Sequence, residues 1–220
     1  MTGKVTVLGV EGYKVSDRYL DSIVLQLSAA HIKQLIRTGD IDKLEQAVLE
    51  GQGKKLVGEY SADYKTRTFL KSIPALMSKI HLLHDAVNSG RLEELQSILD
   101  EEPEKKKKLV LAKDDSGVGL LHKAVYYDLK DIFKWLIDKF PHMVSLRDAE
   151  GRTAYHYTPM CKDPQGVQRL LTNAGADPSG LDMHQHSVRY YMNHKEELEL
   201  PSGGKLTTKS RKSLTNGESE

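Results

Sequence analysis

The side chains in this 220-residue sequence that could bind a metal or carry catalysis are nine histidines and one cysteine. His184 and His186 could share one metal ion on an extended backbone, with Asp182 as a nearby oxygen ligand. Zinc sites need three or four ligands at defined spacing, and the polar residues of this segment fit a solvent-facing role as well. We therefore expect no bound metal and no cofactor, and keep a metal-dependent hydrolase at His184 and His186 as an alternative function.

Cys161 follows His156 by five residues, a pair that could act as a thiol nucleophile and its base. Such a site also needs an orienting group and an oxyanion stabiliser, and neither is recognisable in the sequence. The run Gly51-Gln-Gly53-Lys54-Lys55 is similar to the end of a phosphate-binding loop, but it follows a predicted helix over 40–49 and not a strand. A helix end and a loop explain it better. The sequence predicts a protein that is not an enzyme.

His84, His122 and His156 recur at a regular spacing, and a recurring residue indicates one structural task performed three times. The step from His122 to His156 also carries Gly117, Gly119, Leu136 and Ile137 onto Gly151, Thr153, Leu170 and Leu171. The step before it, from His84 to His122, is slightly longer, because the charged stretch 101–108 is inserted. A weaker copy continues from Asp148 to Asp182.

Each unit predicts two short helices, the first over 83–88 and the second over 91–99, separated by Gly90, which permits a left-handed turn. Apolar residues recur at helical spacing in the second helices, at Leu92, Leu95, Ile98 and Leu99 and again at Ile132, Trp135, Leu136 and Ile137. A lone helix pair could not bury such a face, so the units must stack on one another.

The motifs His84-Asp-Ala86, His122-Lys-Ala124 and Leu170-Leu-Thr-Asn-Ala-Gly175-Ala-Asp-Pro178 resemble the ankyrin repeat, a unit of roughly 33 residues with a β-turn and two helices. The resemblance covers about residues 80–194. No unit contains the family's Thr-Pro-Leu-His motif intact, and Asp128 and Lys162 replace the glycine between the helices. Pro159 lies in the first helix of the fourth unit, which we therefore expect to be short or kinked.

The predicted fold is an all-α, ankyrin-like solenoid of about four to five helix-pair units with an N-terminal cap and a disordered C-terminal tail. We expect a strand or helix cap over 1–30, a degenerate first helix pair with an insertion over 31–79, repeats over 80–194 and a disordered basic tail over 195–220.

The resemblance implies a concave groove, lined by turn tips and first helices, that binds a protein partner and makes the chain an adaptor. The residues predicted to contact that partner are Asp85, Asn88, Ser89, Lys123, Tyr126, Tyr127, Tyr157, Met160, Asp115 and Glu150. Paired tyrosines suit a binding hot spot, although Tyr126 and Tyr127 could instead pack inside the stack. Acidic turn tips favour a partner with a basic segment.

Composition narrows the class of protein further. Lys and Arg number 32 against 31 Asp and Glu, so the net charge of +1 does not favour nucleic-acid binding. No apolar run approaches the roughly 20 residues that span a bilayer, so we expect no membrane insertion. The single cysteine predicts a reducing, cytoplasmic location, with nuclear or cytoskeletal sites also compatible. Regulatory inhibition of an enzyme and a structural role in a cytoskeletal or axonemal assembly stay open as alternatives, as does the oligomeric state.

Overall fold

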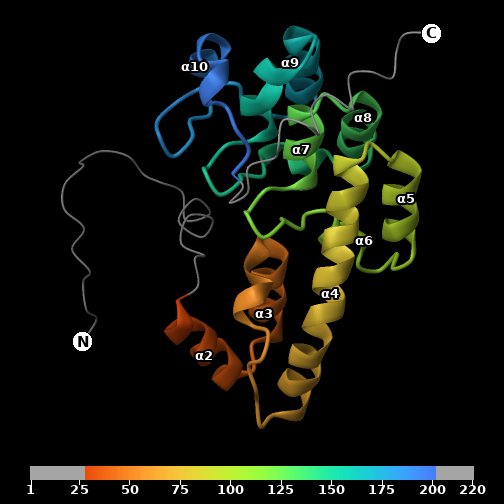
Figure 1. Ribbon diagram of the computed structural model, residues 1–220, viewed down its shortest axis with the longest axis vertical. Helices are drawn as coiled ribbons and strands as arrows, with labels where there is room; N and C mark the ends of the chain where they lie inside the picture. Colours follow the sequence, from red (N-terminus) through yellow and green to blue (C-terminus); the bar gives the residue numbers. More distant parts are fainter. Residues whose placement is uncertain (1–27, 202–220) are drawn as a thin grey trace, which may run out of the picture.

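Apolar residues at helical spacing organise residues 28–201, the part of the chain that this computed structural model describes. The helices follow one another as a stack of antiparallel pairs (Figure 1). In chain order they are α2 (Ala29–Thr38), α3 (Ile41–Ala47), the π-helical turn η1 (Val48–Gln52), the 3-10 helix η2 (Gly53–Lys55), α4 (Tyr64–Asn88), α5 (Leu92–Asp100), α6 (Lys106–Leu109), α7 (Leu120–Tyr126), α8 (Lys130–Lys139), the 3-10 helices η3 (Pro141–Ser145) and η4 (Ala154–Met160), α9 (Pro164–Asn173), α10 (Val188–Asn193) and the 3-10 helix η5 (Lys195–Glu197).

This architecture confirms the predicted all-α solenoid. Within residues 28–201 the extended pairing is limited to an isolated bridge between Lys113 and Gly119. None of the helices in this range is long and apolar enough to cross a lipid bilayer.

Repeat units follow one another as α4 with α5, α7 with α8, and η4 with α9, and the first helix of a further unit is α10. Gly90 joins the first pair with a φ of 69°, and Asp128 joins the second with a φ of 55°. Aspartate is one of the few residues with a side chain that adopt this left-handed conformation. The left-handed turn between α7 and α8 therefore forms even though Asp128 stands where the other unit has glycine.

The first unit departs from the prediction, because its first helix begins at Tyr64 and not at residue 83. The Asp63 carboxylate caps this helix by accepting a hydrogen bond of 2.8 Å from the Thr66 backbone N–H. Leu70, Ile73 and Ile80 then recur at helical spacing and bury the lower half of α4 against α2 and α3 (Figure 1). From Tyr64 on, the region expected to hold an insertion is thus the start of one 25-residue helix.

The segment between α3 and α4 contacts the next repeat at Gly51. A Cβ at this position would lie 2.1 Å from the backbone oxygen of Asp114, and the φ of Gly51 is 83°. The Lys113 backbone N–H also donates to the Leu49 carbonyl at 2.7 Å. These contacts explain the glycines of the run over 51–55 by a close backbone approach rather than by phosphate binding.

The charged insertion that lengthens the first step forms α6 and is neutralised locally. Lys105 pairs with Glu102 at 2.8 Å, and Lys106 pairs with Asp100 at 2.5 Å. Pairs of this kind contribute little to stability when exposed, but they cancel the positive charge of the lysine run.

η4 confirms the effect expected from Pro159, since the first helix of that unit is a seven-residue 3-10 helix. The helix nevertheless buries Ala154, Tyr155 and Tyr157 in the core shared by the repeats. The proline changes the type of helix without removing it from the stack.

Up to residue 201, where the described part of the chain ends, no second α-helix follows α10, and one face of α9 is partly exposed. Leu136 of α8 and Leu170 of α9 occupy the same position of successive units, yet Leu136 is fully buried while Leu170 is 39% exposed. In place of the missing helix, η5 leads into residues 198–201, where Leu198 and Leu200 are buried.

The boundary predicted at residue 195 is therefore wrong, because residues 195–201 join the core through two leucines. The expected cap over 1–30 and the expected tail beyond residue 201 lie largely outside the described residues, which begin at Ser28.

We expect Leu136→Ala to lower the free energy of unfolding by about 2–5 kcal/mol, because it leaves a cavity between neighbouring second helices. Leu170→Ala makes the same change one repeat later on an uncovered face, and we expect it to cost about 1 kcal/mol or less. Urea unfolding followed by circular dichroism measures both values. Equal losses in the two variants would contradict the placement of α8 inside the stack and α9 at its end.

Candidate protein-interaction surface

The turn that precedes each first helix is built around a buried or half-buried aspartate. Through Oδ1, Asp114, Asp148 and Asp182 each accept hydrogen bonds from the backbone N–H groups two and four positions later, at 2.9 to 3.0 Å. Because the same bonds recur at the constant step of the repeats, they define the turn of each unit.

The second carboxylate oxygen, Oδ2, binds a side chain nine residues later. Asp114 pairs with Lys123 Nζ at 2.7 Å, Asp148 accepts from the Tyr157 hydroxyl at 2.5 Å, and Asp182 accepts from the Tyr191 hydroxyl. The prediction that Lys123 and Tyr157 contact a partner is therefore wrong. Lys123 is 7% exposed and Tyr157 fully buried, because both side chains turn inward to hold the aspartate of their own repeat.

The recurring histidines join the first helices to the following turns, as predicted from their spacing. His84 Nε2 lies 3.1 Å from the Ala112 carbonyl, and His122 Nε2 lies 3.1 Å from the carbonyls of Leu146 and Arg152. Burial lowers the pKa of His84 to about 3 and also lowers the pKa of His122. These imidazoles are uncharged structural groups at neutral pH.

The hydrogen bonding of the histidine Nδ1 atom differs between units. In the η4 unit, the Thr153 backbone N–H donates to His156 Nδ1 at 3.1 Å, and the Thr153 hydroxyl lies at the same distance. The equivalent residue before α7 is Gly119, and His122 Nδ1 is buried without a hydrogen-bond partner. A missing hydroxyl thus leaves one polar atom of the second unit unsatisfied.

The first helices of consecutive units present one common surface, which we call the inner face. Its accessible residues lie on the second half of α4 and at the ends of α7 and η4, and they are Leu82, Asp85, Asn88, Ser89, Tyr126, Tyr127 and Met160. Asn88, Tyr126 and Met160 occupy the same position in successive units. The stack therefore aligns them along a single line across the repeats.

Tyr126 and Tyr127 are both half-buried, and each side chain leaves part of its ring accessible. Their rings meet edge to face with centroids 5.1 Å apart, and Tyr126 makes a second such contact with Tyr157 at 5.8 Å. Burial raises the pKa of Tyr127 to about 12. The pair is anchored at its base by the stack and presents its remaining surface on the inner face.

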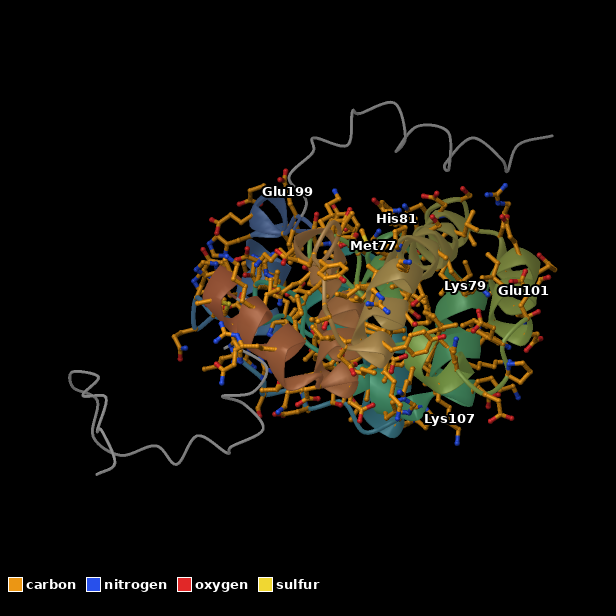
Figure 2. All side chains as sticks on the ribbon, turned by 90° about the horizontal axis from the view of Figure 1, so that it is seen from below. Met77, Lys79, His81, Glu101, Lys107 and Glu199 are labelled. Atoms are coloured by element: carbon orange, nitrogen blue, oxygen red, sulfur yellow. The ribbon has the colours of Figure 1, made fainter. Side chains whose placement is uncertain are left out.

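A cavity of about 380 Å³ adjoins Tyr126, and we call it the inner-face cleft. The repeats contribute Tyr126 and the end of η4, while the opposite wall comes from the segment that follows α10. Its lining residues are Tyr126, Pro159, Met160, Cys161, Lys195, Glu196, Leu198 and Glu199. In Figure 2, Glu199 and His81 of α4 lie along the same edge of the molecule, opposite Lys107 of α6.

The turn tips carry both signs of charge. Asp115 pairs with Lys54 at 2.8 Å and with His81 at 3.4 Å, and Glu150 pairs with His184 at 2.9 Å. The acidic groups that were predicted to attract a basic partner are thus matched by groups of the same chain. Asp115 and Glu150 nevertheless stay accessible, and a partner with a basic segment stays a prediction.

The cysteine, histidine and aspartate side chains considered for catalysis or metal binding make structural contacts. The Cys161 thiol is buried, donates to the Val125 carbonyl at 3.2 Å, and has its pKa raised by burial to about 12. Both carboxylate oxygens of Asp182 accept hydrogen bonds, and the His186 ring stacks on Tyr190 at 3.6 Å. In residues 28–201 no cluster of His, Cys, Asp and Glu fits a metal ion, so the hydrolase alternative gains no support.

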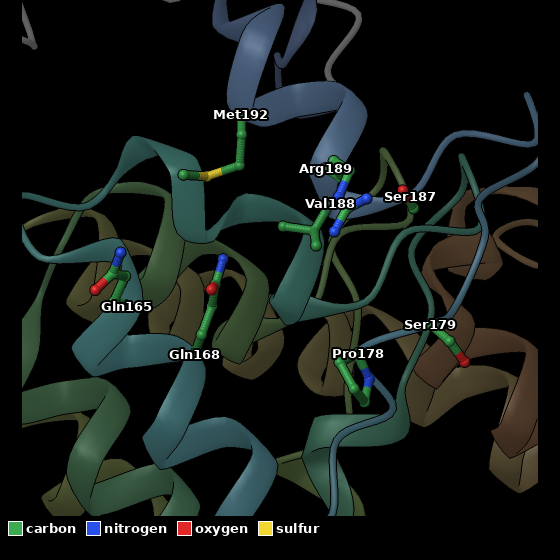
Figure 3. A pocket seen from close by; sticks show the side chains of 8 residues that line it. All are labelled: Gln165, Gln168, Pro178, Ser179, Ser187, Val188, Arg189 and Met192. Atoms are coloured by element: carbon green, nitrogen blue, oxygen red, sulfur yellow. The ribbon is translucent and has the colours of Figure 1, made fainter.

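A second cavity, of about 540 Å³, lies where the terminal unit lacks its second helix. Gln165 and Gln168 of α9 and Val188 and Met192 of α10 border it, together with the loop at Pro178 (Figure 3). None of its lining residues belongs to the inner face.

We expect Gly119→Thr to raise the free energy of unfolding by about 0.5–2 kcal/mol, because it supplies the hydroxyl that His122 Nδ1 lacks. The backbone suits the change, since Gly119 has φ −85° and ψ 166° while Thr153 has φ −90° and ψ 168°. A Cβ at Gly119 would lie 3.0 Å from His122 Nδ1, so the ring must shift slightly.

Gly119→Ala is the matched control, because it adds the Cβ and restricts the unfolded chain without adding the hydroxyl. Chemical unfolding should rank the threonine variant above the alanine variant. An alanine variant of equal or greater stability would show that the hydroxyl makes no useful bond.

Stability should also fall in mild acid. Burial lowers the folded-state pKa of His84, His122 and His156, whereas in the unfolded chain it is about 6.5. Below that value the unfolded state binds protons that the folded state excludes, so the free energy of unfolding decreases as the pH drops. For His84, whose folded-state pKa is about 3, we expect a loss of about 1 kcal/mol between about pH 7 and about pH 5.5, and His122 and His156 change the stability in the same direction. Urea titrations across this window that give a constant stability would contradict the burial of neutral imidazoles.

The family model for ankyrin repeats, in three copies, matches residues 83–182. No curated protein matches the chain. Ankyrin repeats generally mediate protein–protein interaction and are generally non-catalytic. The match spans the turn aspartates, the recurring histidines and the helix pairs described above, and it confirms the resemblance predicted from the motifs. Residues 83–182 of this chain are ankyrin repeats.

Proposed function

We propose that this protein is a non-catalytic binding module that holds a protein partner on its inner face, with Tyr126 and Tyr127 as anchors. The observation that carries the proposal is the half-buried tyrosine pair beside the inner-face cleft. Binding hot spots combine aromatic side chains with a nearby hollow that excludes water.

The geometry of the tyrosines favours recognition. A ring that is fixed at its base by an edge-to-face contact loses little rotational freedom when a partner covers it. Each tyrosine also presents a hydroxyl group beside its apolar ring, so it suits both apolar and polar partner groups. Asp85, Asn88 and Ser89 on α4 are exposed and supply a polar margin next to them.

Rigidity of the repeats supports the same function. The turn aspartates and their bound side chains hold consecutive first helices at fixed positions, and Leu82, which is 51% exposed, extends the inner face along α4. A receptor that is already ordered gives up little entropy when it binds. We propose an adaptor role on this basis.

We expect the double variant Tyr126→Ala and Tyr127→Ala to stay folded and to lose about tenfold or more in partner capture, since truncation of a hot spot costs more than about 1 kcal/mol. The matched control is Lys134→Ala with Asp138→Ala, two exposed residues of α8 that lie outside the inner face. Affinity capture from a cell lysate, quantified by mass spectrometry at two salt concentrations, compares both variants with the wild type, and circular dichroism checks their folding.

The proposal predicts a set of proteins that the wild type and the α8 control retain and the tyrosine variant loses. A set that survives the tyrosine substitutions but disappears with the α8 substitutions would place recognition on the outer surface and overturn the proposal.

A further inference from the structure

One wall of the inner-face cleft is a segment of this chain that packs on the repeats. After α10, one 3-10 turn over Lys195–Glu197 leads into residues 198–201, which run against the repeats instead of forming the missing second helix. Leu198 is 1% exposed and Leu200 is 9% exposed, while Glu199 between them is exposed. Side chains that alternate in this way are typical of an extended segment lying with one side on a surface.

The backbone of this segment is held by a buried arginine. Arg152 Nη1 donates to the Glu199 carbonyl at 2.9 Å, and Arg152 Nε lies 3.2 Å from the Tyr191 hydroxyl. The Arg152 side chain is 9% exposed and is fixed by the turn of the last repeat. Recognition of a carbonyl oxygen is independent of side-chain identity, so this contact would hold any extended segment that places a carbonyl there.

The fit leaves room beside the segment. The 380 Å³ cleft lies between Leu198 and Glu199 on one wall and Tyr126 and Met160 on the other. A segment of similar pattern with larger apolar groups could fill this space and cover more of the tyrosine surface. Such a segment would gain contacts that the chain's own residues do not make.

We propose that the surface beneath residues 197–201, together with the inner-face cleft beside it, is a binding site for an extended segment of a partner protein with two leucine-like residues two positions apart. Residues 197–201 of this chain are its built-in occupant and are displaced when the partner binds. The inference rests on the proposed function, and it specifies the chemistry of the partner: apolar groups at positions i and i+2, and a free carbonyl at position i+1 for Arg152.

The test uses a fluorescent peptide with the sequence of the occupant, Glu-Glu-Leu-Glu-Leu-Pro, and the full-length chain. Leu198→Ser with Leu200→Ser opens the cleft, and Leu170→Ser with Leu181→Ser changes two exposed leucines elsewhere as the matched control. A tethered segment competes at a high effective concentration. We therefore expect the opened variant to bind the peptide at least tenfold more tightly than the wild type or the control, as measured by fluorescence anisotropy, and to ignore a peptide with serine at both leucine positions.

Equal affinity for all three proteins, or no binding to the folded opened variant, would overturn the proposal. Should that variant fail to fold, hydrogen exchange of the wild type decides the matter. Excess leucine peptide should accelerate exchange at the amides of Glu197 and Leu198, which bond to His194 and Lys195 in the docked segment, and unchanged exchange would identify a permanent cap. Partner capture that depends on the tyrosines, with no peptide binding, would leave the proposed function standing and remove only this inference.

Discussion

A carboxylate at the start of each repeat holds two parts of the chain together through its two oxygens. One oxygen of Asp148 accepts two backbone N–H groups and shapes the turn, and the other accepts the Tyr157 hydroxyl from the helix that follows. The first helix is therefore set at a fixed position relative to its own turn. Because hydrogen bonds to a buried charge are strong and costly to leave unmade, the stacking of the repeats depends on these aspartates.

The side chain that meets the second oxygen changes from unit to unit, but its position does not. The residues at this position are Lys123, Tyr157 and Tyr191, which recur at the constant step of the repeats. Each binds the aspartate of its own repeat, through an ammonium group or a hydroxyl. Because these side chains turn inward to bind the aspartates, the accessible residues of the first helices lie at the helix ends. The binding surface that we propose therefore consists of Tyr126, Tyr127 and Met160, because the residues beside them are needed to hold the turns.

Both ends of the stack depart from a regular repeat, and each departure serves packing. At one end, α4 extends past the length of a repeat helix and buries Leu70 and Ile73 against α2 and α3, which gives the first unit a neighbour. At the other end, Leu198 and Leu200 cover first helices while Leu170 stays uncovered. A solenoid must protect the apolar faces of its last units, and this chain protects the inner side more completely than the outer side.

The sequence by itself determined the period, the helix pairs and the structural role of the histidines, because residues that must be buried at every repeat return at a constant spacing. His122 and Leu136 were predictable for this reason, and so was the short helix at Pro159. The sequence also placed Tyr126 and Tyr127 at the surface that the repeats share.

Only the tertiary structure decided which polar residues turn inward and what covers the groove. Lys and Tyr are residue types that often lie at the surface. Lys123 and Tyr157 are buried because each binds a carboxylate nine positions earlier in the chain. The start of α4 at Tyr64 and the burial of Leu198 depend on contacts with residues that do not recur at the repeat spacing. The residue nine positions after the aspartate changes from lysine to tyrosine, and Leu198 packs on residues at irregular distances along the chain. Neither feature appears as a repeated residue type in the sequence, so only the folded geometry reveals it.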